Sequence, residues 1–344
     1  MNNGTNIFIP TMPDPFPKVE RDYPLSEREN LMRALRHEKP LWLPNFENSL
    51  QMGPAGPNQD QPTPPKHDYT DWFGVFRKYS IDQDSCTPVG TVFDSIDEWK
   101  EKAKFPDITN LDWAEGASDF KRDENLVLHT RMNGGIFQRL HALMGFENAL
   151  MDLITEPKKC RELLEALADF EIDVFRNMNE VYHYDLMIYH DDWGTARAPF
   201  FSLDLFKETL LPPTIRIFKA IRDAGVIPMS HNCGLVDVFV PFLVDEIGIS
   251  ALEVQPINDI KGIVEKYGDR CTVELTRPES YFFFDPTTTT AQIKEKAREI
   301  VDTYGAHVNP GAGVMLSFIA PTEEMYNLFD EEVYRYSLEQ YRGL

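Results

Sequence analysis

Residues 226–234 read Val-Ile-Pro-Met-Ser-His-Asn-Cys-Gly, an apolar run that ends in His-x-Cys-Gly ahead of a second apolar stretch. This pattern predicts a buried strand at Val226–Ser230, followed by a helix at Leu235–Ile247. Successive side chains of a strand point to opposite faces, so His231 and Cys233 are expected to point the same way. An imidazole and a thiol together at a strand end could bind one metal ion.

Short apolar runs alternate with helical stretches on both sides of this segment, from Asp185 onward. Strands are predicted at Leu186–Tyr189, Val226–Ser230, Ala251–Val254 and Thr272–Leu275. Helices are predicted at Leu203–Ala224, Leu235–Ile247, Ile257–Tyr267 and Ala291–Tyr304, the last with Thr290 as its N-cap and Gly305 just past its end. Repeated strand–helix units indicate a parallel sheet, and this rhythm fits half of a (β/α)8 barrel.

The first half of the chain is less regular, and we expect inserted material there. Its predicted elements are a helix near Glu27–Arg36, an apolar run at Leu41–Phe46, a strand at Leu126–Thr130 and long helices over Gly135–Ile154 and Pro157–Tyr184. Met52–Pro65 is too rich in Pro and Gly for a helix or an inner strand, so it is expected to be an irregular loop that could cover a barrel mouth. The predicted fold class is α/β, a (β/α)8 TIM barrel in a single domain with N-terminal insertions. Residues 1–25 would form an N-terminal arm and residues 26–344 the barrel.

The composition argues against some classes of partner. The chain of 344 residues has 34 Lys and Arg against 56 Asp and Glu, a formal net charge of -22. This charge repels phosphate backbones and anionic membrane surfaces, so neither nucleic acid nor a membrane is an expected partner. We find no signal-like segment, no apolar run of membrane-spanning length and too few cysteines for a disulfide framework. A cytoplasmic protein with reduced thiols is expected.

Three motifs resemble the uroporphyrinogen decarboxylase superfamily, and most closely its corrinoid-dependent methyltransferases. They are the segment Gly134–Asn148, which opens with Gly-Gly and closes with Met-Gly-Phe-Glu-Asn, then Asp191-Asp192-Trp193-Gly194-Thr195, and His231-Asn232-Cys233-Gly234. The resemblance extends from roughly Glu27 to the C-terminus. It implies a distorted TIM barrel, often dimeric, so a homodimer is one expected assembly. It also implies a site at the C-terminal ends of the strands.

The resemblance further implies a zinc site. In the methyltransferases of the superfamily, zinc is held by His-x-Cys and by a distant cysteine in a Pro-Gly-Cys-Gly turn. The matching turn here is Asn309-Pro310-Gly311-Ala312-Gly313, in which Ala312 replaces the distal cysteine. His231 and Cys233 are therefore two predicted ligands, and the third must come from elsewhere.

Three side chains are candidates for the third ligand, namely Glu253 near the end of one strand, Glu274 on the next strand and Cys271 at the start of that strand. Glu253 is the preferred choice, since a carboxylate is an acceptable zinc ligand. Cys271 is expected at the opposite end of the barrel. The N-terminus of the helix predicted at 235–247 should lower the pKa of the Cys233 thiol and favour the thiolate that binds metal.

Charged residues at other strand ends are predicted to complete the site. Asp191 and Asp192 follow an apolar strand and are the predicted catalytic residues, one of them with a raised pKa suited to proton transfer. Because strand side chains alternate, only one of the two carboxylates can face the pocket, and either Asp191 or His190 faces inward, not both. The alternative interpretation is a pair that caps a helix or fixes the loop around Arg197. The predicted substrate-binding residues are His190, Arg197 and Arg131.

Two further segments bear on the substrate. Tyr281-Phe282-Phe283-Phe284 could form an aromatic wall for an apolar substrate or a corrin, although such runs are more often core. Uroporphyrinogen decarboxylases hold a polycarboxylate with an Arg-rich N-terminal segment, whereas the corresponding Leu41–Asn48 contains no Arg. That activity is not expected here.

The resulting functional hypothesis is a corrinoid-dependent methyltransferase with a zinc Lewis acid. The missing distal thiolate lowers the negative charge donated to zinc, which favours demethylation of a small methylated substrate such as an O-methyl compound. The sequence has no evident cobalamin-binding segment, so a partner protein would carry the corrinoid. Two alternatives remain open: a metal-free decarboxylase of a small organic acid, and a ligand-binding barrel without activity.

Overall fold

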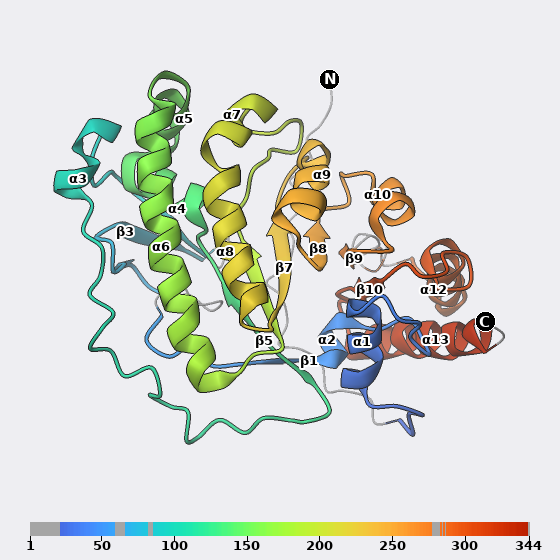
Figure 1. The fold of residues 1–344 in the computed structure, drawn as a ribbon. Coiled ribbons are helices and arrows are strands. Elements are labelled where there is room, and N and C mark those ends of the chain that lie inside the picture. Colours follow the sequence, from blue (N-terminus) through green and yellow to red (C-terminus); the bar gives the residue numbers. More distant parts are fainter. Residues whose placement is uncertain are drawn as a thin grey trace.

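The main sheet of the protein has seven parallel strands. The structure, a computed structural model, describes residues 21–58, 66–81, 85–276, 283, 285 and 287–342. The strands are β1 (Leu50–Met52), β5 (Val127–Met132), β6 (Leu186–His190), β7 (Ile227–Asn232), β8 (Ala251–Val254), β9 (Thr272–Thr276) and β10 (Val314–Ser317). They pair in the order β1-β5-β6-β7-β8-β9-β10 and form a curled α/β sheet, as in TIM-barrel-like folds (Figure 1).

The strands predicted in the second half of the chain are confirmed as β6 to β9. The bounds of β8 are those predicted, and β6 and β9 each end one residue later. Strand β7 begins at Ile227 and ends at Asn232, so His231 lies within the strand rather than after it. The predicted strand at Leu126–Thr130 corresponds to β5.

The segment before β1 connects the two ends of this strand order. Asn45 forms a parallel bridge with Leu316 of β10, whose N–H donates to the carbonyl of Pro44 over 2.8 Å. The Asn45 side chain then caps the short helix α2 (Phe46–Ser49), which leads directly into β1. The predicted apolar run at Leu41–Phe46 therefore contains this single bridge, and its last residue begins α2.

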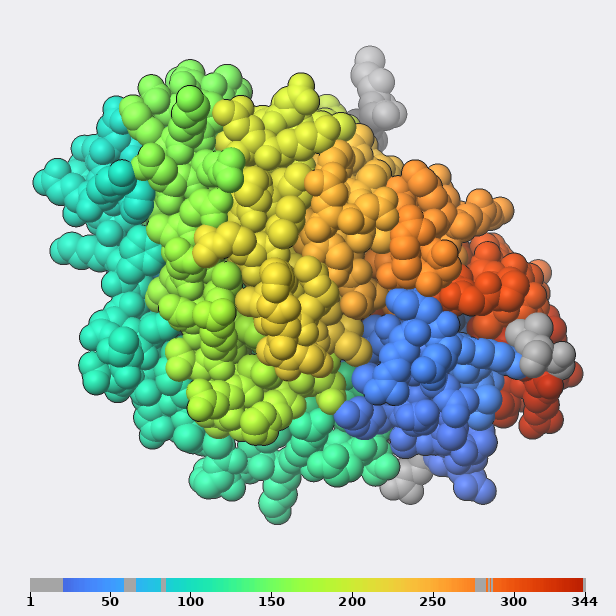
Figure 2. Space-filling view, viewed as in Figure 1, coloured from blue at the N-terminus to red at the C-terminus, as the bar shows by residue number. Residues whose placement is uncertain are grey.

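Helices cover the sheet, and α6 and α8 run side by side along it (Figure 1). The longer helices are α1 (Glu27–Leu35), α4 (Ile136–Met144), α5 (Phe146–Thr155), α6 (Pro157–Tyr182), α7 (Leu203–Thr209), α8 (Leu211–Asp223), α10 (Ile260–Tyr267), α12 (Thr290–Tyr304) and α13 (Glu323–Tyr341). Helices α1 and α2, near the start of the described chain, lie beside α13 at its end (Figures 1 and 2).

Several predicted helices differ from those observed. The helix predicted over Gly135–Ile154 is two helices, because Gly145 adopts a φ of 84° between α4 and α5. The helix predicted over Leu203–Ala224 breaks at Leu210, just before two prolines that enter the first turn of α8. The N-cap of α12 is Thr289, in a capping box with Gln292, and not Thr290.

The segment Leu235–Ile247 is not the regular helix that was predicted. It consists of a 3-10 turn, η2 (Asp237–Phe239), one α-turn, α9 (Val240–Phe242), and a π-turn, η3 (Leu243–Ile247). Pro241 lies in the middle of the segment, where it cannot donate a helical hydrogen bond. No helix dipole of useful length therefore begins just after Cys233.

The interior of the curled sheet has an apolar layer and a polar layer. The buried apolar residues that share one cluster on the strands are Val127, Leu186, Ile188, Met229, Ala251 and Met315. Two residues further along β6, β7 and β8, the same face carries His190, His231 and Glu253, which are register partners of one another. The change from apolar to polar toward the C-terminal ends of the strands makes that end of the sheet the place for chemistry.

The inserted material between β1 and β5 includes a three-stranded antiparallel sheet, β2 (Tyr69–Thr70), β3 (Phe76–Ser80) and β4 (Ser85–Pro88). Of the predicted irregular loop Met52–Pro65, residues 53–58 are coil and turn, and residues 59–65 lie outside the described residues. The aromatic run at 281–284 is described only at Phe283, which is buried against Phe318 and Phe329. Within the described ranges, no helix is long and apolar enough to cross a membrane.

Candidate metal centre

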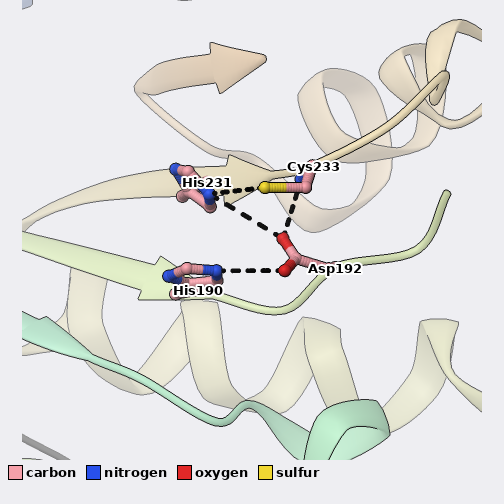
Figure 3. A group of neighbouring side chains, drawn as sticks. All are labelled: His190, Asp192, His231 and Cys233. Carbon is pink, nitrogen blue, oxygen red and sulfur yellow. Dashed lines mark hydrogen bonds and ion pairs between the residues drawn. The ribbon is translucent and has the colours of Figure 1, made fainter. Parts of the chain in front are cut away.

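His231 and Cys233 face each other at the end of β7, as their spacing predicts. His231 is the second-last residue of the strand and Cys233 follows its end. Nε2 of His231 lies 3.3 Å from Sγ of Cys233 (Figure 3). The imidazole is mostly buried, with a side-chain exposure of 13%. The two donor atoms are therefore close enough to share one ion.

Strand β6 brings a second pair of donors to the same place. His190 and Asp192 have the same i, i+2 spacing, and His190 is the register partner of His231. Nε2 of His190 lies 3.2 Å from Oδ2 of Asp192, and Oδ1 of Asp192 lies 3.8 Å from Nε2 of His231 (Figure 3). One ligand atom from each of the four residues lies within 4.8 Å of the others.

These distances match what a small tetrahedral ion requires. Zinc binds nitrogen, oxygen and sulfur at ~2.0–2.3 Å, which places the ligand atoms roughly 3.3–3.8 Å from one another in a tetrahedron. The shortest separations are 3.2 Å from His190 to Oδ2 of Asp192, 3.3 Å from His231 to Cys233, and 3.8 Å from His231 to Oδ1 of Asp192, and the four ligand atoms span up to 4.8 Å. Two imidazoles, one carboxylate and one thiol are also donors that zinc accepts.

Asp192 is ionised at neutral pH. Burial acts to raise its pKa, but the hydrogen bond to His190 and the nearby His231 outweigh it and lower the pKa to about 2. The backbone N–H of Cys233 donates to Oδ1 over 2.8 Å, and Nε2 of Gln138 donates to Oδ2 over 2.8 Å. Asp192 is thus a fixed anion between the two strand ends.

Glu253 lies behind His231 and not among the clustered donors, which corrects the prediction that it is the third ligand. Its Oε2 is 2.7 Å from Nδ1 of His231, on the far side of the imidazole from Cys233. Burial acts to raise the pKa of Glu253, but His231 and Arg131 lower it, so the group is charged. A carboxylate in this position orients a ligating imidazole and increases its basicity.

The other two candidates for a third ligand are also remote. Burial, with the charges of Glu253 and Glu47, raises the pKa of Glu274 well above its usual value, so this group is a neutral acid, and it lies on β9, one strand beyond Glu253. Cys271 precedes β9, at the opposite end of the strand, and burial raises the pKa of its thiol. This position is the one predicted for Cys271.

Ala312 lies at the wrong end of β10 to replace a metal ligand. The turn that contains it precedes β10, and the N–H of Gly313 donates to the carbonyl of Gly268 over 2.7 Å. The segment that follows β10 toward the site reads Phe318-Ile319-Ala320 and has no cysteine. The motif match that assigned Ala312 to the distal ligand position was therefore wrong in register.

Asp191 points away from the cluster and caps α4. It is fully buried, and its carboxylate accepts hydrogen bonds from the backbone of Phe137 and Gln138 and from the indole of Trp193, over 2.9–3.1 Å. Burial raises its pKa to about 7 against the effect of these donors. The predicted alternation holds, with His190 inward and Asp191 outward. Its position corrects the prediction that Asp191 is catalytic.

Two glycines lock the loops that carry the donors. Gly234 has a φ of 84°, and a Cβ there would lie 2.2 Å from the carbonyl carbon of Gly194. The N–H of Leu235 donates to the carbonyl of Thr195 over 2.8 Å. The Asp-Asp-Trp-Gly and His-x-Cys-Gly motifs therefore meet backbone to backbone, and this contact positions Asp192 beside Cys233.

Comparison with known proteins identifies the family of this chain. Residues 129–330, more than half of the chain, match the family model described as uroporphyrinogen decarboxylase (URO-D). The chain belongs to the uroporphyrinogen decarboxylase family. Its fold is similar to that of a methyltransferase from Methanosarcina mazei, with a TM-score of 0.64 and 13% sequence identity over 92% of this chain and 99% of the other. No curated protein sequence matches the chain significantly.

The predicted substrate-binding residues of this uroporphyrinogen decarboxylase family member lie in different places. His190 is in the cluster, and Arg131 on β5 reaches to 3.7 Å from Oε2 of Glu253. Arg197 is exposed in a turn and forms no ion pair with any residue that the structure describes. It therefore does not neutralise Asp191 or Asp192.

Two contacts of the site were missed by sequence reasoning. Gln138 of α4 donates a hydrogen bond to Asp192 and anchors it. The only sequence signal for this role is its position three residues after Gly135. The N–H groups of Gly234 and Val236 are bonded by the side chains of Gln255 and Asn258, both over 2.8 Å. These N–H groups thus hold the loop, and no regular helix begins beside the Cys233 thiol.

Proposed function

We propose that this member of the uroporphyrinogen decarboxylase family is a zinc-dependent methyltransferase. It would move a methyl group between a small methylated substrate and a corrinoid carried by a partner protein. The observation that carries the proposal is the convergence of four nitrogen, oxygen and sulfur donors at the ends of β6 and β7. The similar fold of a methyltransferase supports it.

The residues fit a zinc ion. His231 and Cys233 would bind it, with Asp192 and His190 in place of the distal cysteine, since the four ligand atoms lie within 4.8 Å of one another and are of types that zinc accepts. When bound, zinc would supply a Lewis acid to the atom that gives or receives the methyl group. Because a catalytic zinc keeps one open position, three of the four donors would suffice to hold it, with His190 paired to Asp192 as in the structure.

The remaining residues would hold this centre in shape. Glu253 orients His231 through the close contact with Nδ1, and Gln138 holds Asp192. The site lies at the mouth of the curled sheet, and we propose that the Asn45 segment completes a closed (β/α)8 barrel through its bridge to Leu316. The corrinoid partner would dock over this mouth.

The positions of the two aspartates argue against a metal-free decarboxylase. That alternative needs a carboxylic acid that protonates a reacting carbon. Asp192 reaches the site but holds no proton at neutral pH, because its pKa is about 2. Asp191 has a raised pKa but is fully buried against α4. Neither residue combines access with a proton to give.

Metal analysis of purified protein tests the proposal. We expect about one zinc per chain in the wild type and a loss of most of it in His231→Ala and in Cys233→Ala. Cys86→Ala is the matched control, because Cys86 lies on β4, away from the donors, and should keep the metal. Methyl transfer from methylated aromatics and amines to a corrinoid protein should require His231 and Cys233. Wild-type protein that contains no stoichiometric metal would refute the proposal.

A further inference from the structure

Arg131 is a mostly buried arginine whose ion pair with Glu253 is long. It lies on β5 with a side-chain exposure of 24%, and its nearest carboxylate oxygen, Oε2 of Glu253, is 3.7 Å from Nη2. That distance is longer than a hydrogen bond. Among the residues that the structure describes, no acceptor bonds to this guanidinium. Its five N–H donors are therefore available.

Other arginines with the same exposure are paired tightly. Arg28 and Arg122 have side-chain exposures of 25% and 26%, and they contact Asp185 at 2.6 and 2.8 Å. Arg139, with an exposure of 1%, contacts Asp71 at 2.7 Å. Arg222 is also half-buried and donates to the carbonyls of Ile247 and Gly248. Arg131 differs from these arginines, because its nearest carboxylate is 3.7 Å away and it lies on the face of the sheet that carries the candidate metal centre.

Arg131 is within reach of that centre. It pairs in register with Ile188 on β6, so it lies one inward-facing position below His190. The carboxylate oxygen that it approaches is the oxygen 2.7 Å from Nδ1 of His231. A small molecule bound to the guanidinium would therefore extend directly toward the donors of His231, Cys233 and Asp192.

We propose that Arg131 binds a carboxylate of the substrate, so that the substrate class is small methylated carboxylic acids. The planar fork of a guanidinium matches a carboxylate in a bidentate geometry. A phosphate fits less well, because its second charge would meet the carboxylate groups of Glu253 and Asp192 that lie next to Arg131 and His231. The inference rests on the proposed function in making this mouth the substrate site.

The arrangement would orient the substrate. A carboxylate fixed on Arg131 leaves the other end of a small molecule pointing at the proposed zinc site, where the methyl group is exchanged. Holding both ends removes rotational freedom that a reaction in solution would have to lose. A neutral analogue of the same shape would lack the anchor and bind more weakly.

Calorimetric titration with benzoate and benzamide tests the inference, because the two probes share a shape and differ in charge. We expect benzoate to bind the zinc-loaded wild type at least about tenfold more tightly than benzamide or inorganic phosphate does, as for a charged hydrogen bond. Arg131→Met should remove this preference, and Arg131→Lys should retain part of it. Arg197→Met is the control, since Arg197 is exposed in a turn with no ion pair among the described residues, and it should match the wild type.

Equal binding of benzoate to wild type and Arg131→Met would overturn the inference, as would a wild type that prefers phosphate or binds neither probe. Because Arg131→Met leaves Glu253 without its nearest cation, the fold of each variant is checked by its melting temperature. If Arg131→Met does not fold, the Arg131→Lys comparison decides. Metal content is measured on the same samples. A metal-free protein that still binds benzoate through Arg131 would contradict the proposed function and leave the carboxylate site standing.

Discussion

Residues of the same type at the strand ends have different structural roles, which the residue type alone does not predict. Asp191 and Asp192 are neighbours in sequence, yet one caps α4 and the other lies among the donors. Glu253 and Glu274 are register partners on adjacent strands, yet one is charged and the other neutral. The difference follows from neighbours: Glu253 has an imidazole and a guanidinium beside it, whereas Glu274 faces two other carboxyl groups.

This contrast gives a prediction for metal affinity. Glu253→Gln removes the negative charge behind His231 and should weaken zinc binding by about 10–100-fold, as for other partners of ligating histidines. Glu274→Gln is the matched control and should change the affinity little, because the native side chain is already neutral. Competition with a chromophoric chelator measures both. Equal affinity of Glu253→Gln and the wild type would mean that Glu253 does not support the ligand.

At the scale of elements, the site depends on two loops that meet through glycine. The loops after β6 and β7 carry Asp192 and Cys233, and their backbones touch at Gly194 and Gly234. No side chain fits between them, so both motifs end in Gly for a steric reason. The contact also fixes the spacing of donors that come from different strands.

Gly234→Ala should therefore disrupt the centre. An alanine at a φ of 84° is strained, and its Cβ would lie 2.2 Å from the carbonyl carbon of Gly194. Gly225→Ala is the control, since Gly225 has a φ of 76° and nothing within 4 Å of a new Cβ. The control should cost about 1–2 kcal/mol for the backbone conformation alone. Gly234→Ala should cost more and also lose zinc. Similar melting temperatures and similar zinc contents for the two variants would contradict the loop contact.

Over the whole molecule, hydrophobic periodicity predicted the elements that depend on local sequence. It did not predict contacts between segments that are distant in the sequence. The strands β6 to β9 and the shared face of His231 and Cys233 followed from apolar runs and from the i, i+2 rule. The partnership of His190 with His231 could not be predicted, because sheet order and register are set by tertiary packing. The cap formed by Asp191 depends on where α4 begins in space.

The misplacement of Ala312 has a related cause. A Pro-Gly-x-Gly turn looks alike at either end of a strand, and only the bounds of β10 show that this one comes first. Fold class was easier to predict than ligands, since a strand–helix rhythm tolerates errors of a few residues. A metal ligand displaced by one strand length lies at the other end of the sheet.

The inserted sheet is tied to α4 by a buried ion pair, which makes the molecule sensitive to acid. The carboxylate of Asp71, at the start of the β2–β3 connection, contacts Arg139 of α4 at 2.7 Å and Arg77 of β3 at 2.9 Å. Burial acts to raise the pKa of Asp71, but the two guanidinium groups lower it. A lowered carboxyl pKa stabilises the fold above the unfolded value of about 3.9, and this stabilisation is lost as the pH falls through the lower folded value.

Asp71→Asn should separate this contribution from those of other acids. At pH 7 the variant should be less stable by about 3–5 kcal/mol, because the buried Arg139 loses the counter-charge of Asp71. Below pH 4, urea unfolding of the wild type should lose stability more steeply than that of the variant, which has no carboxylate to protonate there. Asp68→Asn, on the exposed side of the same segment, is the control and should keep the wild-type stability within about 0.5 kcal/mol. Parallel acid profiles for the wild type and Asp71→Asn would contradict a stabilising ion pair between the insertion and α4.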